Sequence, residues 1–176
     1  MRHITTALLF AGMLSVPAAA QSNPQTRQGF WINFGVGAGS LGCDDCGDDR
    51  ETGTNAQLRM GGTLSQRLLI GGEANFWTKS DGDLTLSTGN FGPVILFYPS
   101  ANGGFFLKGG LGLSNTSLEF GSFTIEDNGI GVTLGLGYDA RVGKRFALTP
   151  YFDIINSSYD GGSFNQVAFG LGFTWP

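Results

Sequence analysis

Histidine, cysteine and charged residues are scarce in this sequence. Only 14% of its 176 residues are charged, against ~25% in an average soluble protein. The single histidine is His3, and the two cysteines are Cys43 and Cys46. The formal net charge is −4 and basic runs are lacking, which excludes the basic patch of a nucleic-acid-binding protein. No apolar run outside the N-terminal stretch reaches the ~20 residues of a membrane-spanning helix.

Glycine and phenylalanine are abundant instead. The chain contains 30 glycines and 15 phenylalanines, and 12% of its residues are aromatic. A collagen-like chain would need a glycine at every third position, and a disordered chain would lack the aromatic residues. Neither description fits. Few charges, many glycines and many phenylalanines together predict β-structure that contacts something other than water.

Residues 1–20 have the features of a cleaved secretory signal peptide. Arg2 and His3 precede a mostly apolar stretch at 5–16, and three alanines at 18–20 provide the small residues of a cleavage site. An uncleaved signal anchor is the alternative. Cleavage removes the only histidine, so the histidine bases of hydrolytic and acyl-transfer enzymes are missing from the mature chain. We therefore expect no enzymatic activity.

Alternation of apolar residues with small or polar ones is the strongest signal in the sequence. In residues 30–39, Phe30, Ile32, Phe34 and Val36 alternate with glycine and asparagine. A period of two indicates β-strands, whereas a helix would repeat every three or four residues. The predicted strands are 30–39, 55–64, 67–77, 84–98, 104–114, 129–139, 145–155 and 166–175.

The connections between these strands alternate in length. Residues 65–66, 99–103 and 140–144 are short, whereas 40–54, 78–83, 115–128 and 156–164 are mostly longer and more polar. Eight strands with both chain ends beside the short turns are typical of a small outer-membrane barrel. A soluble eight-stranded barrel of the lipocalin type is the competing interpretation.

The two faces of the strands favour the membrane barrel. In a soluble barrel the face made mostly of glycine would meet water, with almost no lysine or glutamate to prevent association. In a membrane barrel the large apolar side chains contact lipid, and the glycines fit a lumen barely wide enough for side chains. The sequence therefore predicts an all-β, eight-stranded, antiparallel, up-and-down transmembrane β-barrel that follows a cleaved signal peptide.

The sequence resembles the small eight-stranded outer-membrane barrels, the group of OmpX, Ail and the OmpA transmembrane domain. The resemblance rests on the signal peptide, the eight alternating segments and the closing strand 167–175, and it covers residues 28–176. It implies a signal peptide at 1–20, a short N-terminal arm at 21–28 and a barrel domain at 29–176. It also implies recognition of the last strand by the barrel-assembly machinery, through Phe169, Leu171, Phe173 and Trp175. Pro176 departs from this pattern, because it makes the final aromatic residue penultimate.

Several polar residues fall on the predicted lumen face. We expect a packed internal network, because buried charges need partners and opposite signs are nearly balanced there. An ion or proton path is the alternative. The predicted network consists of Arg59, Glu73, Lys108, Asp139, Tyr151 and Asp153.

Two of the predicted external loops carry further candidate features. Cys43 and Cys46 are predicted to form a disulfide in an oxidising compartment, with free thiols or a metal or redox role as alternatives. The acidic residues around them indicate a solvated loop, and a calcium site is the alternative. Phe120 and Phe123 are predicted at the tip of another loop, either as an adhesive surface or as a hairpin packed on its neighbours.

The predicted function is that of an integral protein of the outer membrane of a Gram-negative-type bacterium, with a structural or surface-interaction role and a packed lumen. A narrow pore or transporter for ions or small hydrophobic molecules is the alternative, and a soluble ligand-binding barrel is a second one. The expected partners are outer-membrane lipid, lipopolysaccharide, the barrel-assembly machinery and a surface protein. We expect a monomer with no cofactor, no metal and no nucleic-acid partner.

Overall fold

The computed structural model describes residues 26–43, 49–121, 123–143 and 145–175, and the regular structure in these ranges is entirely β. The described residues contain no helix long and apolar enough to cross a membrane. The strands are β1 (Phe30–Cys43), β2 (Arg50–Ser65), β3 (Leu68–Asp81), β4 (Leu84–Phe97), β5 (Phe105–Phe120), β6 (Phe123–Tyr138), β7 (Ala140–Gly143), β8 (Phe146–Tyr159) and β9 (Gly162–Trp175).

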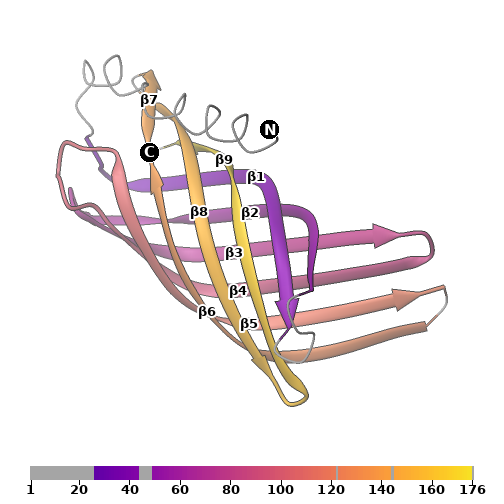
Figure 1. Cartoon of the computed structure of the whole chain (residues 1–176). Coiled ribbons are helices and arrows are strands. Elements are labelled where there is room, and N and C mark those ends of the chain that lie inside the picture. Colours follow the sequence, from indigo (N-terminus) through magenta and orange to yellow (C-terminus); the bar gives the residue numbers. More distant parts are fainter. Residues whose placement is uncertain (1–25, 44–48, 122, 144, 176) are drawn as a thin grey trace, which may run out of the picture.

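The sheet closes on itself as an eight-stranded antiparallel barrel (Figure 1). The strands β1 to β6 pair in chain order, β1 also pairs with β9, and β6 pairs with β8. Within the described residues, the four-residue β7 pairs with the start of β8 and with no other strand, so it extends one hairpin and is not a ninth strand of the barrel wall. The predicted fold class is therefore confirmed.

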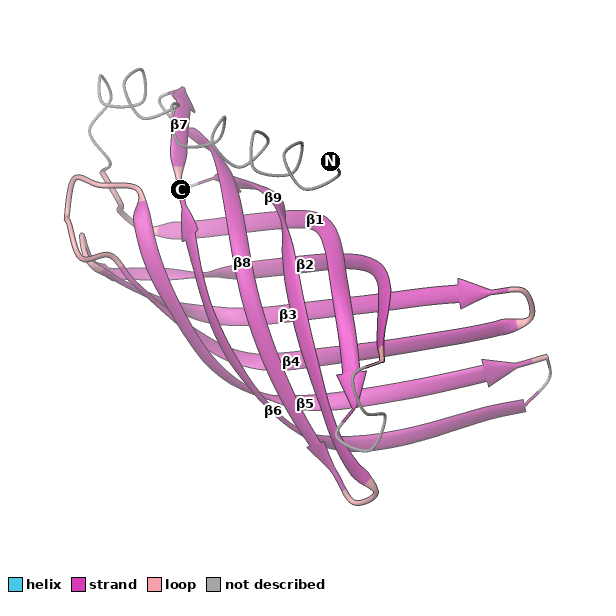
Figure 2. Cartoon of the chain, viewed as in Figure 1, coloured by secondary structure: helices cyan, strands magenta, loops and turns pink. Residues whose placement is uncertain are grey.

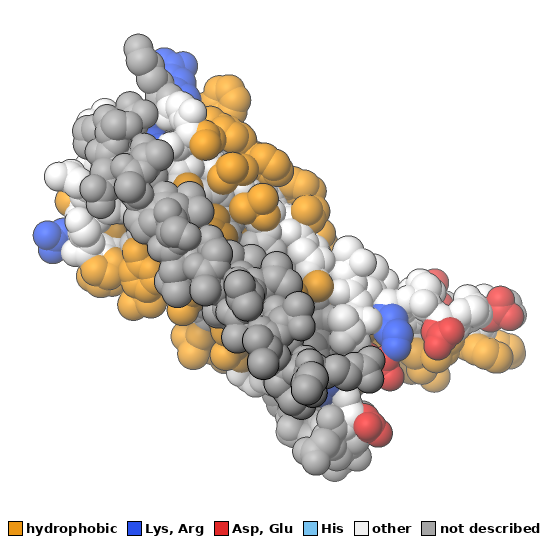
Figure 3. Space-filling view, turned by 45° about the horizontal axis from the view of Figure 1, so that its top comes forward, with side chains coloured by type: hydrophobic (Ala, Val, Ile, Leu, Met, Phe, Trp, Pro, Cys, Tyr) orange, Lys and Arg blue, Asp and Glu red, His pale blue; other side chains and the backbone are white. Residues whose placement is uncertain are grey.

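Most of the large apolar side chains lie on the outside of the barrel. Phe34, Phe91 and Leu113 are more than half exposed, whereas lumen residues such as Asn33 and Gln57 are almost fully buried. Figure 3 shows hydrophobic side chains over the barrel wall and charged side chains toward the ends. This arrangement is the reverse of a soluble barrel and matches the lipid-facing band of an outer-membrane barrel.

Lumen glycines make room for large side chains. A Cβ atom at Gly131 would overlap the side chain of Asn90, and one at Gly137 would overlap the ring of Phe106. By contrast, a Cβ atom at Gly109, on the lipid face, would have no neighbour within 4 Å. The packing reason for many inward-facing glycines is thus direct steric competition with longer lumen side chains.

The strands extend farther than the sequence pattern predicts. Residues 40–43, 50–54, 78–81, 115–120, 123–128, 140–143, 156–159 and 162–164 were expected in loops or turns but are strand. The expectation was wrong because polar residues there continue the ladder: the hydroxyl groups of Thr78 and Ser87 lie 3.0 Å apart across β3 and β4. Tight turns with a positive φ at Gly82 and Gly121 close the two long hairpins.

The β3–β4 and β5–β6 hairpins project from one end of the barrel (Figure 2). They form one sheet, because β4 and β5 stay paired as far as Leu84 and Phe120. We call the part of this sheet around the β3–β4 and β5–β6 turns the projecting sheet. The opposite end holds both described chain ends, the turns 66–67 and 98–104, and the β6–β8 connection that contains β7, and we call it the terminal rim.

Candidate functional site

Four charged side chains meet inside the barrel. Arg59 of β2, Glu73 of β3, Lys108 of β5 and Asp153 of β8 are each at most 4% exposed. The Lys108 Nζ atom lies 2.5 Å from Glu73 Oε2 and 2.8 Å from Asp153 Oδ2, and the Arg59 Nε atom lies 3.8 Å from Glu73 Oε2. Two cations and two anions thus form a neutral buried cluster, which we call the lumen ion cluster.

Strand register and a glycine bring these residues together. Arg59 and Glu73 face each other directly across β2 and β3. Lys108 faces Gly135 on β6, and Gly135 in turn faces Asp153 on β8. A Cβ atom at Gly135 would overlap Asp153 Oδ1, so glycine at this position lets the ammonium of Lys108 and the carboxylate of Asp153 meet.

Uncharged side chains surround the lumen ion cluster. The Asn33 Oδ1 atom accepts hydrogen bonds from Nε and Nη2 of Arg59 at 3.1 and 2.9 Å. The Tyr151 hydroxyl donates to Asn55 at 3.0 Å, and Asn55 donates to Asn75 at 2.9 Å. Tyr151 therefore belongs to a separate amide chain and is not hydrogen-bonded to the four charged groups in the structure.

The lumen is filled with side chains toward its other end as well. The ring of Trp77 is 1% exposed, and its Nε1 donates to the carbonyl of Gly39 at 2.9 Å. A buried indole and a neutral ion cluster in one narrow barrel are the arrangement expected of a packed interior.

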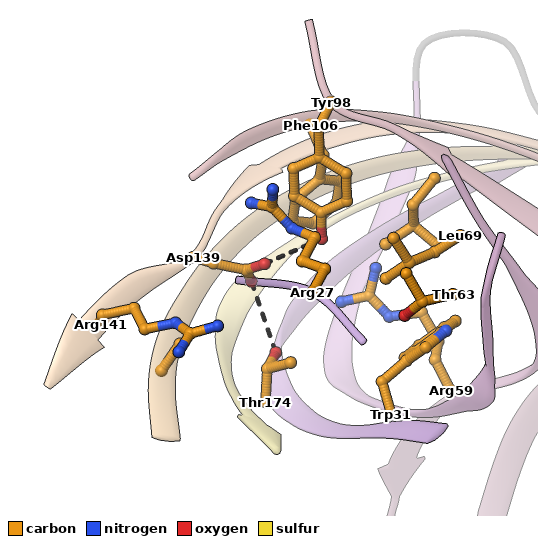
Figure 4. A pocket seen from close by; sticks show the side chains of 12 residues that line it. Arg27, Trp31, Arg59, Thr63, Leu69, Tyr98, Phe106, Asp139, Arg141 and Thr174 are labelled. Atoms are coloured by element: carbon orange, nitrogen blue, oxygen red, sulfur yellow. Dashed lines mark hydrogen bonds between the residues drawn. The ribbon is translucent and has the colours of Figure 1, made fainter. Parts of the chain in front are cut away.

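A second polar cluster closes the terminal rim. Figure 4 shows Arg27 beside the ring of Tyr98, with Asp139 and Arg141 on the same side. The guanidinium carbon of Arg27 lies 3.4 Å from the Tyr98 ring centroid, and the Tyr98 hydroxyl donates to Asp139 at 2.8 Å. A cavity of about 20 Å³ lies among these residues, which is room for about one water molecule.

Arg27 joins the turns of the terminal rim. Its guanidinium donates to the carbonyls of Gln66 and Ala101 at 3.2 Å and to that of Gly103 at 2.5 Å. Arg141 of β7 donates to the carbonyl of Thr26, the residue before Arg27, at 2.9 Å. The sequence interpretation missed this role, because an arginine in a short polar arm carries no periodic signal.

The surroundings of the terminal rim shift two pKa values. Burial, with the nearby negative charge of Asp139 as a second cause, raises the pKa of Tyr98 above its usual range. Partial burial, with the positive charge of Arg27 as a second cause, lowers the pKa of Arg141. Asp139 was predicted with the lumen charges. Asp139 is buried at the terminal rim, where it accepts hydrogen bonds from Tyr98 and Thr149. Thr149, Thr174 and Asn33 continue this series of hydrogen bonds to Arg59 of the lumen ion cluster.

The other predicted site residues lie on the outside or at strand ends. Cys43 ends β1, whereas Cys46 and the acidic residues 44, 45 and 48 lie outside the described residues, so their pairing and ligand roles stay predictions. Phe120 and Phe123 face each other across the β5–β6 turn and are 62% and 76% exposed. The predicted assembly residues lie on the outer face of β9, all at least 44% exposed: Phe169, Leu171, Phe173 and Trp175.

A closed barrel with apolar side chains outside and paired charges inside defines a transmembrane β-barrel. A family model described as "Outer membrane protein beta-barrel domain" matches residues 6–175, so the chain belongs to this family of outer-membrane barrels. No curated protein matches the chain.

Solved barrels share this fold at low sequence identity. Ail of Yersinia pestis is 14% identical with a TM-score of 0.61, over 85% of this chain and 100% of Ail. Neisserial surface protein A is 12% identical with a TM-score of 0.66, over 86% and 99% of the two chains. The N-terminal barrel of OprF from Pseudomonas aeruginosa is 12% identical with a TM-score of 0.54, over 85% and 100%.

Proposed function

We propose that this protein is a non-enzymatic anchor in the outer membrane that presents a sheet at the cell surface for interaction with another protein. The observation that carries the proposal is the contrast between the two parts of the molecule. The lumen is filled by the lumen ion cluster and Trp77, whereas the projecting sheet leaves apolar side chains uncovered.

The projecting sheet is suited to contact. Leu118, Phe120, Phe123 and Ile125 share one face of β5 and β6, because Leu118 faces Ile125 and Phe120 faces Phe123. Leu84 of β4 joins them opposite Phe120. All five are exposed, and an exposed apolar patch on a membrane-anchored protein supports a contact surface.

Removal of the tip aromatics tests the surface role. Cells that display Phe120→Ser/Phe123→Ser should adhere less to matrix-coated surfaces than cells that display the unaltered protein at equal surface density. Leu64→Ser is the control. Leu64 is similarly exposed, but it lies at the end of β2 in the terminal rim, away from the projecting sheet. Undiminished adhesion of the tip variant would contradict the proposal.

A packed lumen is tested by electrical measurement. Eight strands leave space for side chains and not for an aqueous channel, so the protein in a planar bilayer should show no discrete openings. Steady openings in the unaltered protein would favour the alternative, a narrow pore.

Membership of the family supports the proposed location and partners. After export and removal of residues 1–20, the barrel would insert as a monomer through the barrel-assembly machinery, with the terminal rim toward the periplasm. The apolar wall would then contact outer-membrane lipid and lipopolysaccharide. N-terminal sequencing of the inserted protein should give Gln21 as its first residue.

A further inference from the structure

Three buried nitrogen donors near the terminal rim have no acceptor. Among the described residues, Nε of Arg27, Nε1 of Trp31 and Nη1 of Arg59 find no hydrogen-bond partner, and the three residues are at most 4% exposed. The other guanidinium nitrogens of the two arginines donate to rim carbonyls and to Asn33. A buried donor without an acceptor costs stability, and native proteins provide an acceptor for almost every such group.

The same three residues line one cavity. It is the cavity of about 20 Å³ at the terminal rim, and Figure 4 shows the side chains around it. Arg27 reaches it from the N-terminal arm, Trp31 from β1 and Arg59 from β2. Three separate parts of the chain thus bring unpartnered donors to a space with room for one water molecule or one monatomic ion.

The charged groups that line the cavity are mostly positive. They are the guanidinium groups of Arg27, Arg59 and Arg141 and the carboxylate of Asp139. Both oxygens of that carboxylate already accept hydrogen bonds from side-chain hydroxyl groups. Glu73 lies 3.8 Å from Nε of Arg59, but it is shared with Lys108. The surroundings therefore favour a negative occupant.

The unpartnered atoms at the cavity suit an anion better than a water molecule. A buried water brings two hydrogens that need acceptors of their own, whereas a halide ion accepts from several donors and donates to none. Elsewhere in the lumen, Gln57 leaves both its amide nitrogen and its amide oxygen without a partner within the described residues. That mixed set suits water. The set of Arg27, Trp31 and Arg59 consists of donors alone.

We infer that Arg27, Trp31 and Arg59 bind one chloride ion, or another monatomic halide, in the cavity at the terminal rim. The ion would accept hydrogen bonds from the three nitrogen donors and offset the positive charge around it. It would also connect the N-terminal arm to β1 and β2 inside the barrel. Sulfate and phosphate would be excluded, because a tetrahedral oxyanion does not fit the space of one water molecule. The inference is independent of the surface role, which belongs to the opposite end of the barrel.

The test compares salts with the full-length mature protein in detergent. Thermal unfolding is followed in sodium chloride, sodium bromide and sodium gluconate at equal concentration. Gluconate is the reference, because it provides the same ionic strength with an anion too large for the cavity. An ion that binds only the folded protein stabilises it, so the melting temperature should be higher in both halides than in gluconate, and the difference should grow with halide concentration.

Trp31→Phe tests the site, because it removes one of the three donors and keeps an aromatic ring in the lumen. It should raise the dissociation constant for chloride about tenfold and so shrink the difference between chloride and gluconate. Trp77→Phe is the matched control, because it removes another buried indole donor, one that bonds to the carbonyl of Gly39. It should lower the melting temperature in every salt and leave the halide-dependent difference unchanged.

Crystals grown in sodium bromide locate the ion. Anomalous scattering from bromide should give a peak in the cavity, within hydrogen-bond distance of Nε1 of Trp31. The peak should be weaker or missing in crystals of Trp31→Phe.

Several results would overturn the inference. Equal melting temperatures in chloride, bromide and gluconate would mean that halide does not bind, and a bromide peak without such a difference would mean binding at crystal concentration only. An undiminished halide effect in Trp31→Phe, or an equal loss of it in Trp77→Phe, would place the effect elsewhere. Ordered water in the cavity of bromide-grown crystals would assign the three donors to water.

Discussion

At the scale of single residues, Lys108 is the centre of the lumen ion cluster. Its ammonium contacts both Glu73 and Asp153, and all three side chains are almost fully buried. Replacement of both partners of a buried ion pair by apolar residues often changes the stability of a protein little. Removal of one partner is strongly destabilising, because it leaves an uncompensated buried charge. Loss of Lys108 therefore removes an ion pair from both carboxylates, whereas loss of one carboxylate leaves Lys108 paired with the other.

Lys108→Met should lower the free energy of unfolding in detergent by about 3–5 kcal/mol, because it leaves two buried carboxylates without their shared cation. Urea titration followed by the mobility of unboiled samples in SDS gels measures this change. Lys79→Met is the matched control, because Lys79 pairs with Glu51 on the exposed end of the sheet. Equal stability of the two variants would show that the lumen ion cluster is not needed to neutralise the carboxylates.

Gly135 is the second residue on which the lumen ion cluster depends. Gly135→Ala places a methyl group against Asp153 and the Phe152 carbonyl, and such overpacking should cost about 1–3 kcal/mol. Gly109→Ala is the control, because its new methyl group meets no atom within 4 Å on the lipid face. If both alanine variants melt at the temperature of the unaltered protein, the lumen is less tightly packed than the structure indicates.

At the scale of strands and turns, the N-terminal arm ties the terminal rim together. Arg27 bonds to carbonyls of the β2–β3 and β4–β5 turns, and Thr26 accepts a hydrogen bond from Arg141 in the β6–β8 connection. Backbone hydrogen bonds from Tyr98 to Arg67 and from Asp139 to Gly104 also link these turns. The arm is therefore a structural part of the barrel and not only a spacer after the signal peptide.

Arg27→Ala should destabilise the terminal rim, because three carbonyls lose a charged donor and Tyr98 loses the cation over its ring, at a cost of about 2–3 kcal/mol. Hydrogen exchange should become faster in residues 98–104 and change little in the projecting sheet. Arg67→Ala is the control, because Arg67 is exposed in the same rim. Uniform exchange changes over the whole barrel would contradict a local role.

The strands also show what the sequence could and could not predict. The period of two located the membrane-spanning part of every long strand, because Phe30, Ile32 and Phe34 must all face lipid. It missed the strand ends, because Thr78 and Ser87 continue the ladder without an apolar phase. It placed Arg59 and Glu73 on the lumen face, but their contact depends on a register that composition does not encode.

At the scale of the whole molecule, closure of the barrel depends on the pairing of the last strand with the first. The described part of β9 runs to Trp175, which faces Ile32 on β1, and both side chains are exposed on the wall. An exposed indole at the terminal rim contributes little to packing inside the protein. The resemblance to other outer-membrane barrels predicts a role in recognition during assembly for Phe169, Leu171, Phe173 and Trp175, and this prediction can be tested.

Trp175→Ala should therefore separate assembly from stability. In cells, the amount of inserted, heat-modifiable barrel should fall severalfold, whereas protein refolded in detergent should melt close to the unaltered protein. Phe30→Ala is the control. Phe30 is a similarly exposed aromatic residue at the start of β1, at the same end of the barrel as Trp175. A loss of stability in detergent as large as the loss of insertion in cells would mean that Trp175 acts through packing. Equal insertion of the two variants would mean that the final strand is recognised without its last aromatic residue.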